Sequence, residues 1–140
     1  MNIDGVNTGI VLDHIKAGTA IKVYNILKLD ELDACVAIIQ NASSQKYGKK
    51  DIIKIDAPIR LNLDVLGYLD SNITVNYIEE KKAVKKVHLT LPETIQDVIK
   101  CTNPRCITST EQEIVHEFRL IDREEKIYSC IYCDAYHTAP

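Results

Sequence analysis

Two closely spaced cysteine pairs near the end of this 140-residue chain have the residue types and spacing that hold a metal ion. Cys101 and Cys106 are separated by four residues, and Cys130 and Cys133 by two, so each short loop can turn both sulfur atoms toward one point. Four thiolates complete a tetrahedral shell, the usual arrangement of structural zinc, and leave no position open for substrate. Iron also accepts sulfur ligands, and disulfides or free thiols are the remaining alternatives. The spacing favours one structural zinc ion per chain.

A second group of residues that can do chemistry is cationic. Eight of the 17 basic residues fall in two stretches of the chain, namely Lys46, Lys49, Lys50 and Lys54, then Lys81, Lys82, Lys85 and Lys86. A lysine ammonium group is a compact charge suited to phosphate, and Asp13 and His14 are suited to a ribose hydroxyl and a phosphate. Solvated lysines that protect a sheet edge are the alternative. Neighbouring strand residues face opposite sides, so Asp13 and His14 can share a pocket only where their strand ends.

The elements that must position these residues follow from the spacing of apolar residues. The predicted strands are 9–15, 33–42, 51–57 and two within 73–91, and the predicted helices lie in 18–29 and 62–70. The run 33–42 is dense enough in apolar residues to predict a buried strand, and its Cys35 is expected to be a small core residue. The order β-α-β-β-α-β is that of the ferredoxin-like unit.

The composition changes near Pro92, where apolar density falls and the cysteines begin. Segments 113–121 and 124–130 predict a hairpin. We therefore predict an α+β protein, with a ferredoxin-like antiparallel sheet and two helices in residues 1–91 and a small all-β, zinc-ribbon-like domain in 92–140. A domain of ~50 residues is too short to be held by an apolar core alone, so metal binding and folding are expected to be one event there. Since four cysteines complete the shell, His116 and His137 are expected to be surface residues.

Charge and hydropathy exclude several classes of protein. The net charge of −3 argues against binding of the whole protein to nucleic acid or to an anionic membrane. No apolar stretch approaches the ~20 residues that cross a bilayer, and the first residues lack the basic start and apolar run of a signal peptide. These features predict a cytoplasmic protein, where disulfides are rare. Without a nucleophile or an open metal site beside Asp13 and His14, the chain is not expected to be an enzyme.

Several motifs, taken together and in order along nearly the whole chain, closely resemble the regulatory chain of aspartate carbamoyltransferase. They are VLDHI (11–15), GKKDIIKI (48–55), LPETI (91–95), CTNPRCIT (101–108) and CIYC (130–133). The resemblance implies a non-catalytic subunit of pyrimidine biosynthesis, with a nucleotide-binding allosteric domain followed by a zinc domain that contacts the catalytic chain. It implies that regulatory chains pair through their first domains and that three pairs bridge two catalytic trimers. CTP would inhibit, UTP would assist it in some members, and ATP would activate at the same site.

The resemblance also carries residues over by position. Asp13 matches a ribose-contacting aspartate, Lys54 a lysine near the ribose and base, and His14 and Lys86 the phosphate-binding residues. The chain departs from the family at one point, because the tyrosine near the base aligns with Lys81. The full set of residues implied for nucleotide binding is Val6, Val11, Asp13, His14, Lys50, Lys54, Asn76, Ile78 and Lys86.

The main alternative function is a zinc-ribbon protein that binds nucleic acid. Such a protein would need basic and aromatic residues clustered around its metal loops. The tail instead carries Glu111, Glu113, Glu117, Glu124 and Glu125. The polar residues around the metal loops, Asn103, Arg105 and Asp134, are candidate contacts with the catalytic chain or surface residues that help the loops to fold.

Overall fold

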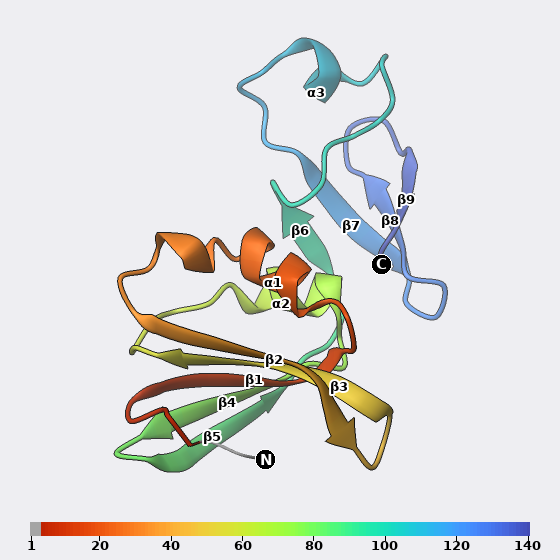
Figure 1. Cartoon of the computed structure of the whole chain (residues 1–140). Helices are drawn as coiled ribbons and strands as arrows, with labels where there is room; N and C mark the ends of the chain where they lie inside the picture. The colour runs from red at the N-terminus through yellow and green to blue at the C-terminus, as the bar shows by residue number, and fades with distance from the viewer. Residues whose placement is uncertain (1–3) are drawn as a thin grey trace.

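Two antiparallel sheets, one in each half of the chain, make up the fold (Figure 1). It is described from a computed structural model, in which residues 4–140 are described. The first half contains β1 (Gly9–Lys16), α1 (Ala20–Ile26), the 3-10 turn η1 (Leu29–Glu31), β2 (Cys35–Ser44), β3 (Gly48–Asp56), α2 (Leu63–Leu69), β4 (Thr74–Glu79) and β5 (Lys82–His88). The second half contains β6 (Thr94–Gln96), α3 (Ile107–Thr110), β7 (Glu117–Asp122), β8 (Ile127–Cys130) and β9 (Tyr136–Thr138).

The first sheet has the strand order β2-β3-β1-β4-β5, with every neighbouring pair antiparallel. Its elements follow the predicted order β-α-β-β-α-β, and the two strands predicted within 73–91 are the β4–β5 hairpin, so the predicted fold class is confirmed. The second sheet has the order β6-β7-β8-β9, and the predicted hairpin is β7–β8. The strands β6 and β9 were not predicted, because three residues are too few for an alternating pattern to be recognised.

Alternation along the central strands builds the main core beneath the helices, which lie on one face of the first sheet (Figure 1). Ile10 and Leu12 of β1 pack with Ile53 and Ile55 of β3 and with Leu66 of α2, and all five side chains are at most 1% exposed. Burying an aliphatic side chain of this size contributes ~1.5–3 kcal/mol. The opposite face of the sheet has no covering helix in the described residues, and it carries the polar residues considered below.

A buried carboxylate, that of Asp51, ties two irregular segments to β3. Its Oδ2 accepts hydrogen bonds from the backbone N–H groups of Gly18 and Ala20, at 2.9 and 3.0 Å, and its Oδ1 accepts one from Asn41 at 2.9 Å. Gly18 and Ala20 lie at the start of α1, and Asn41 lies in a β-bulge of β2 with φ of 59°. The side chain is fully buried, so its lone pairs are satisfied by the backbone rather than by water.

A second β-bulge interrupts β1 at Asp13 and His14. The pairing with β3 shifts between Leu12 and Ile15, and His14 has a left-handed φ of 60°. The core side of the strand is therefore occupied by residues 10, 12 and 15 rather than 10, 12 and 14. The inserted residue allows Asp13 and His14 to face the same side. From the sequence, we expected Asp13 and His14 to share a pocket only if β1 ended there. In the structure a bulge brings the two side chains to one side, and β1 continues to Lys16.

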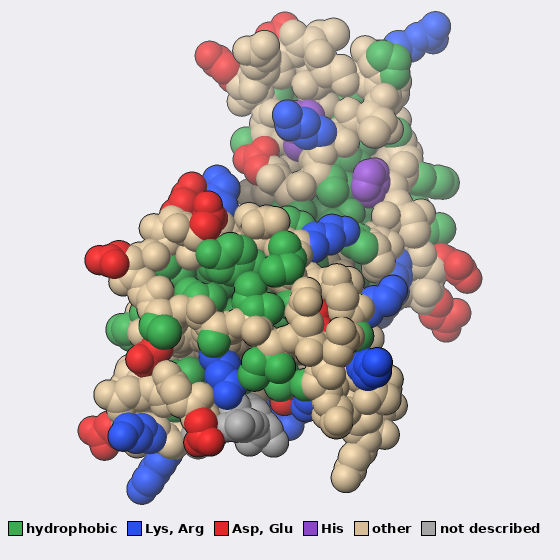
Figure 2. All heavy atoms as spheres, viewed as in Figure 1, with side chains coloured by type: hydrophobic (Ala, Val, Ile, Leu, Met, Phe, Trp, Pro, Cys, Tyr) green, Lys and Arg blue, Asp and Glu red, His purple; other side chains and the backbone are tan. Residues whose placement is uncertain are grey.

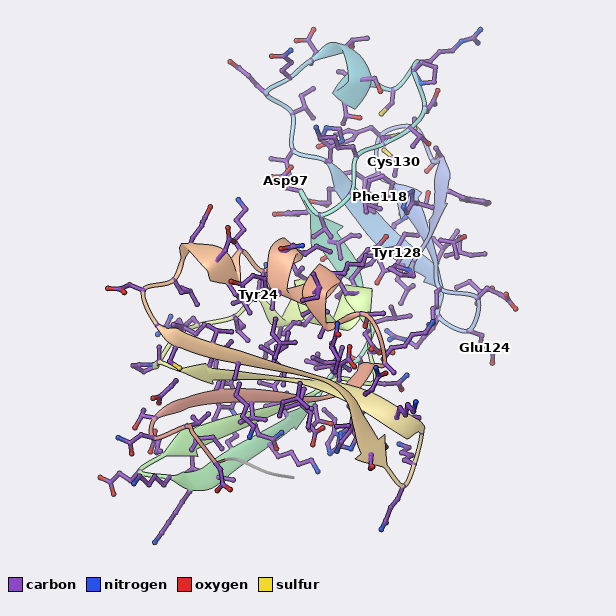
Figure 3. The ribbon with its side chains drawn as sticks, in the orientation of Figure 1. Tyr24, Asp97, Phe118, Glu124, Tyr128 and Cys130 are labelled. Carbon is purple, nitrogen blue, oxygen red and sulfur yellow. The ribbon has the colours of Figure 1, made fainter. Side chains whose placement is uncertain are left out.

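The two halves of the chain share a core. Tyr68 of α2 packs edge-on against Tyr128 of β8, with ring centroids 5.4 Å apart. The Tyr128 hydroxyl donates to the backbone carbonyl of Pro92, and Arg123 donates to that of Leu91 at 2.9 Å. Figure 3 shows Tyr128, Phe118 and Cys130 along the second sheet, from the end near the first sheet toward the cysteine loops. The apolar cluster of the second half thus begins on a helix of the first.

The prediction for β2 was wrong in one respect. This strand is an edge strand of the sheet, paired only with β3 among the described residues, and its burial alternates between half-buried and exposed. Cys35, expected to be a small core residue, is exposed at its start. The dense apolar run misled the interpretation because alternate residues of an edge strand face solvent even when they are aliphatic.

The close contact between α2 and the segment that joins the halves gives a stability prediction. A Cβ atom added at Gly67 would lie 2.2 Å from the backbone oxygen of Thr90. Alanine normally stabilises a helix interior relative to glycine by ~1 kcal/mol, but here the clash requires α2 or the joining segment to move, at a cost of ~1–3 kcal/mol. We expect Gly67→Ala to lower the melting temperature. The exposed position Lys22→Ala in α1 is the control, and a higher melting temperature for Gly67→Ala would contradict the contact.

Candidate functional site

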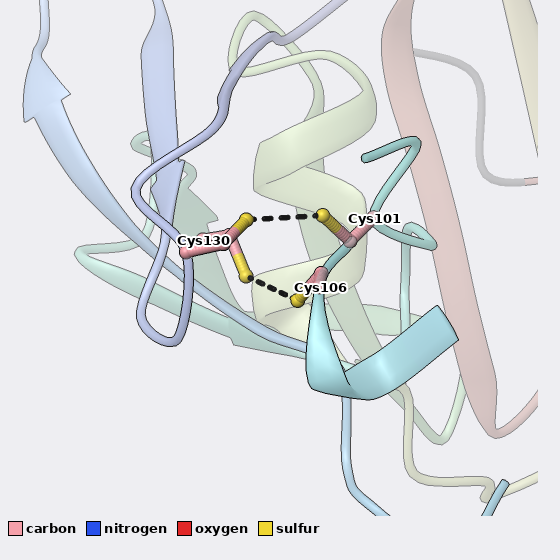
Figure 4. Close-up of side chains that lie close together, drawn as sticks. Cys101, Cys106 and Cys130 are labelled. Atoms are coloured by element: carbon pink, nitrogen blue, oxygen red, sulfur yellow. Dashed lines mark hydrogen bonds between the residues drawn. The ribbon is translucent and has the colours of Figure 1, made fainter. Parts of the chain in front are cut away.

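The four predicted metal ligands converge at the far end of the second half (Figure 4). Cys101 and Cys106 come from the loop between β6 and α3, Cys130 ends β8, and Cys133 lies in the turn before β9. The four Sγ atoms all lie within 4.8 Å of one another. Cys106 and Cys130 are fully buried, and the other two are half-buried.

The spacing of the sulfur atoms fits a tetrahedral metal ion. Four sulfur atoms bound at about 2.3 Å from zinc would lie about 3.8 Å apart. The Cys101 and Cys133 sulfur atoms are 3.6 Å apart, and those of Cys106 and Cys130 are 3.7 Å apart. All four cysteines are free, so the disulfide alternative finds no support in the described residues. The donor set is that of a closed, structural site.

The surroundings of the cysteines change the pKa values of their thiols. Burial raises the pKa of Cys130, and it raises the pKa of Cys101 to about 12. The Thr108 hydroxyl donates a hydrogen bond to the Cys106 sulfur at 3.1 Å and lowers the pKa of that thiol to about 7. Four thiolates this close together would repel one another, so a positive ion among them would favour the charged form of all four.

The two histidines of the second half lie near the cluster but outside the ligand set of the described residues. The Nδ1 atom of His116 accepts a hydrogen bond from the backbone N–H of Cys101 at 3.3 Å. His137 packs against the Phe118 ring, with centroids 6.0 Å apart. Both were expected to be surface residues, and both are half-buried.

The open face of the first sheet contains a hollow of about 420 Å³, here called the sheet hollow. It is lined by Asp13, His14, Lys50, Asn76, Ala83, Val84, Lys85 and Lys86. Five of these residues are among the nine implied for nucleotide binding: Asp13, His14, Lys50, Asn76 and Lys86. The remaining three, Ala83, Val84 and Lys85, come from β5. The sequence showed that this stretch is rich in lysine, but it could not show which residues of β4 pair with it.

Strand register explains why these distant residues meet. Lys54 of β3 pairs with Val11 of β1, Val11 pairs with Asn76 of β4, and Asn76 pairs with Lys86 of β5. Directly paired residues share a face, so the four form one row across the open side of the sheet. The Asn76 side-chain amide donates to the Val11 carbonyl at 3.3 Å and is held in place within this row.

The charge of the sheet hollow is predominantly positive. Lys50 Nζ lies 3.0 Å from Asp13 Oδ1, and both side chains are largely buried. Burial opposes the charge on Asp13, but hydrogen bonds from Lys50 and from the His14 backbone outweigh it and lower the pKa of Asp13. Burial and the neighbouring lysines lower the pKa of His14, whose Nδ1 lies 3.1 Å from the Thr74 hydroxyl. With Lys50 neutralised by Asp13, Lys86 remains as a positive group suited to an anion.

Four of the nine implied residues lie outside the lining of the sheet hollow. Val6, Val11 and Ile78 belong to a small buried apolar cluster that also contains Ile52. The Lys54 ammonium group donates to the backbone carbonyl of Asp4 at 3.0 Å. Val6 also lines a separate hollow of about 380 Å³ beside Lys81. The structure therefore brings five polar members together and sets the other four, Lys54 among them, beside these five on the same side of the sheet.

The chain matches two family models in succession. Residues 1–90 match the allosteric domain of the aspartate carbamoyltransferase regulatory chain, and residues 93–140 match its metal-binding domain. The regulatory chain of Clostridium acetobutylicum is 52% identical, over 96% of this chain and 92% of its own length. Those of Clostridium tetani and Bifidobacterium longum are 50% and 43% identical, each over 96% of this chain, with 94% and 96% of their own lengths covered. None of the helices in residues 4–140 has the length and apolar character needed to cross a membrane.

Metal removal tests the dependence of the second half on its ion. Because Cys106 and Cys130 belong to its apolar core as well as to the cluster, complete removal by a mercurial reagent and chelator should unfold residues 92–140 and leave the first sheet folded. Hydrogen exchange read by mass spectrometry should show loss of protection in β7 and β8 and retention in β1 and β3. Unchanged exchange after verified metal loss would contradict the prediction.

The Asp13–Lys50 pair gives a prediction with a definite sign. A carboxyl group whose pKa is lowered by folding stabilises the folded chain above its unfolded-state pKa, near 3.8, and loses that contribution as pH falls through the folded value. Asp13→Asn should therefore be destabilised relative to the parent protein at pH 7, by ~1–3 kcal/mol, because Lys50 is left without its partner.

Urea unfolding at several pH values provides the measurement. The difference between Asp13→Asn and the parent protein should shrink below pH 3.8. The exposed aspartate Asp33, changed to asparagine, is the control and should show little effect at either pH. A difference that stayed constant across this range would show that the pair does not act through the charge of Asp13.

Proposed function

Because the chain belongs to the family of aspartate carbamoyltransferase regulatory chains, we propose that its first half binds nucleotide effectors and its second half, folded around zinc, docks on the catalytic chain. CTP is the inhibitor, with UTP assisting it, and ATP is the activator at the same site. Regulatory chains pair through their first halves and bridge catalytic trimers in the cytoplasm. Membership of this family makes the chain a non-catalytic subunit, and it favours this function over nucleic-acid binding.

The observation that carries the nucleotide proposal is the meeting of Asp13, His14, Lys50, Asn76 and Lys86 around one hollow. A triphosphate needs positive groups, and Lys86 supplies one that is not paired with Asp13. A ribose needs a hydroxyl acceptor, and the ionised Asp13 is one. The Val6–Val11–Ile52–Ile78 cluster adjoins this row and offers apolar contacts for a base. Lys81 lines the hollow beside Val6, which supports a contact with the base at that end.

A contiguous set of contacts supports transmission from this hollow to the metal centre. The backbone N–H of Lys16, which ends β1, donates to the Asp70 carboxylate after α2 at 3.1 Å. Two residues earlier, Tyr68 packs on Tyr128, and the same apolar cluster extends to Cys130. An effector that prefers one arrangement of β1 over another would thereby bias the orientation of the second half. Coupling free energies of this kind are typically ~1–3 kcal/mol.

Exposed apolar residues support pairing of the first halves. Figure 2 shows apolar side chains gathered over the part of the first half where Figure 1 draws α1 and β2. Ile21 and Ile26 of α1 are 48% and 40% exposed, and Ile39 of the edge strand β2 is 36% exposed. An edge strand beside exposed aliphatic side chains is a natural surface for association.

The surroundings of the metal loops support docking on the catalytic chain. Ile107, Ile131 and Tyr132 flank the cysteines and are each exposed by more than a third. Arg105 and Asp134 are exposed polar residues at the same end and are the proposed contacts. Asn103 has a local role instead, since its side chain accepts from the Arg105 backbone and its carbonyl accepts from Ser109.

Lys86→Ala tests the nucleotide site. Removal of this ammonium group should weaken CTP and ATP together by on the order of tenfold, equivalent to ~1.4 kcal/mol, and should leave assembly with catalytic trimers intact. Calorimetric titration measures the affinities, and size-exclusion chromatography measures assembly. Lys82→Ala is the matched control, because it removes the same charge from the same strand without lining the sheet hollow. Equal weakening in both variants would count against the site.

Cys106→Ala tests the metal domain. Loss of one of four ligands should release the zinc and abolish assembly with catalytic trimers, while CTP binding by the first half is largely retained. Metal content is measured by atomic emission alongside the same two assays. The division of labour between the halves would be refuted if Lys86→Ala and Cys106→Ala each lost both nucleotide binding and assembly.

A further inference from the structure

A second and larger hollow, of about 580 Å³, lies where the two halves of the chain meet; we call it the junction hollow. Its walls come from the end of β1, the start of α1, the turn between β2 and β3 and the end of α2, with Lys126 and Pro140 contributed by the second half. Four lysines line it, and they are called the junction lysines: Lys16, Lys22, Lys49 and Lys126. None of the four lines the sheet hollow.

The lysines of the junction hollow outnumber its acidic side chains by four to one. Among its lining residues Asp70 is the one acidic side chain, and its two oxygens accept backbone hydrogen bonds from Lys16 and Asn72, at 3.1 and 3.0 Å. Within residues 4–140, none of the junction lysines forms an ion pair with an acidic side chain. Lys126 Nζ donates a hydrogen bond to the backbone oxygen of Pro140 at 3.4 Å, so in this part of the chain three of the four ammonium groups are free to meet a ligand and the fourth lies beside them. In a chain whose net charge is −3, four ammonium groups around one hollow mark a site where an anion is the missing partner.

The remaining lining residues indicate what kind of anion fits. The side chains of Asn72 and Tyr47 supply amide and hydroxyl donors, and Ile15, Val23 and Leu69 form an apolar part of the wall. A volume of about 580 Å³ exceeds the size of a single phosphate ion and accommodates a small carbon skeleton as well. We propose that the junction hollow binds a small phosphorylated compound, held by the junction lysines, that bridges the two halves of the chain.

His14 separates this site from the sheet hollow. The residue lines both hollows, and its ring lies edge-on to Tyr47 of the junction hollow, with centroids 6.2 Å apart. A ligand of the junction hollow therefore contacts one side of a residue whose other side faces the proposed nucleotide site. It also reaches Lys126, and so ties the turn between β7 and β8 to the first sheet. The site is distinct from the sheet hollow and stands whether or not CTP binds there.

Two phosphate probes test the proposal in the metal-loaded full-length chain. Inorganic pyrophosphate and ribose 5-phosphate are titrated by calorimetry in a Lys86→Ala background, which lacks the phosphate-facing lysine of the sheet hollow. We expect at least one probe to bind, and the further changes Lys22→Gln and Lys126→Gln to raise its dissociation constant at least about tenfold. Amide shifts in NMR spectra should concentrate at Gly18 and Lys126.

The matched control removes two exposed lysines that line neither hollow. Lys82→Gln with Lys100→Gln loses the same charge and should change the dissociation constant by less than about threefold, since distant charges are screened by salt. If Lys22→Gln and Lys126→Gln weaken the binding of ribose 5-phosphate, the ligand is an organic phosphate. If they weaken only the binding of pyrophosphate, the ligand is an inorganic one. Absence of binding by both probes, or an equal effect in the control pair, would overturn the proposal. Unchanged melting temperatures establish that each variant is folded.

Discussion

Four sulfur atoms within 4.8 Å of one another are the constraint on which the second half of the molecule depends. Burial disfavours the thiolate form at Cys101 and Cys130, and a metal ion reverses that preference by supplying positive charge. The same residues are part of the apolar cluster that includes Phe118 and Tyr128. The four cysteines therefore belong to both the metal cluster and the apolar packing of this half of the chain.

In the first half, the charged side chains gather on the open face of the sheet. Its sheet has one face covered by helices and one face open, and the open face carries a row from Lys54 to Lys86. A buried Asp13–Lys50 pair neutralises part of this charge and fixes the position of both side chains. The bulge at His14 then turns an additional group toward the same hollow. A rigid sheet with a local irregularity thus presents several polar groups to one small volume.

Much of this organisation could be predicted from sequence, for identifiable reasons. The cysteine spacing specified the metal cluster because short loops leave few geometries, and apolar alternation specified β1, β3 and the order of elements. The bulge at Asp13 and His14 could have been found from the apolar residues at 10, 12 and 15, whose spacing breaks the period of two. The exposure of Cys35 could not, because strand order decides which strand is at the edge. The shared Tyr68–Tyr128 contact and the junction hollow also depend on the tertiary arrangement of the halves.

The carboxylate of Asp51 joins segments that are far apart in sequence: the turn before α1 and the irregular part of β2. One side chain serves both, so neither segment can detach without leaving a buried oxygen atom of Asp51 short of a hydrogen-bond donor. The wall of the junction hollow and the free edge of the first sheet are consequently mechanically linked. A neighbouring subunit that displaced β2 would also disturb the geometry of Gly18, on the far side of the same side chain.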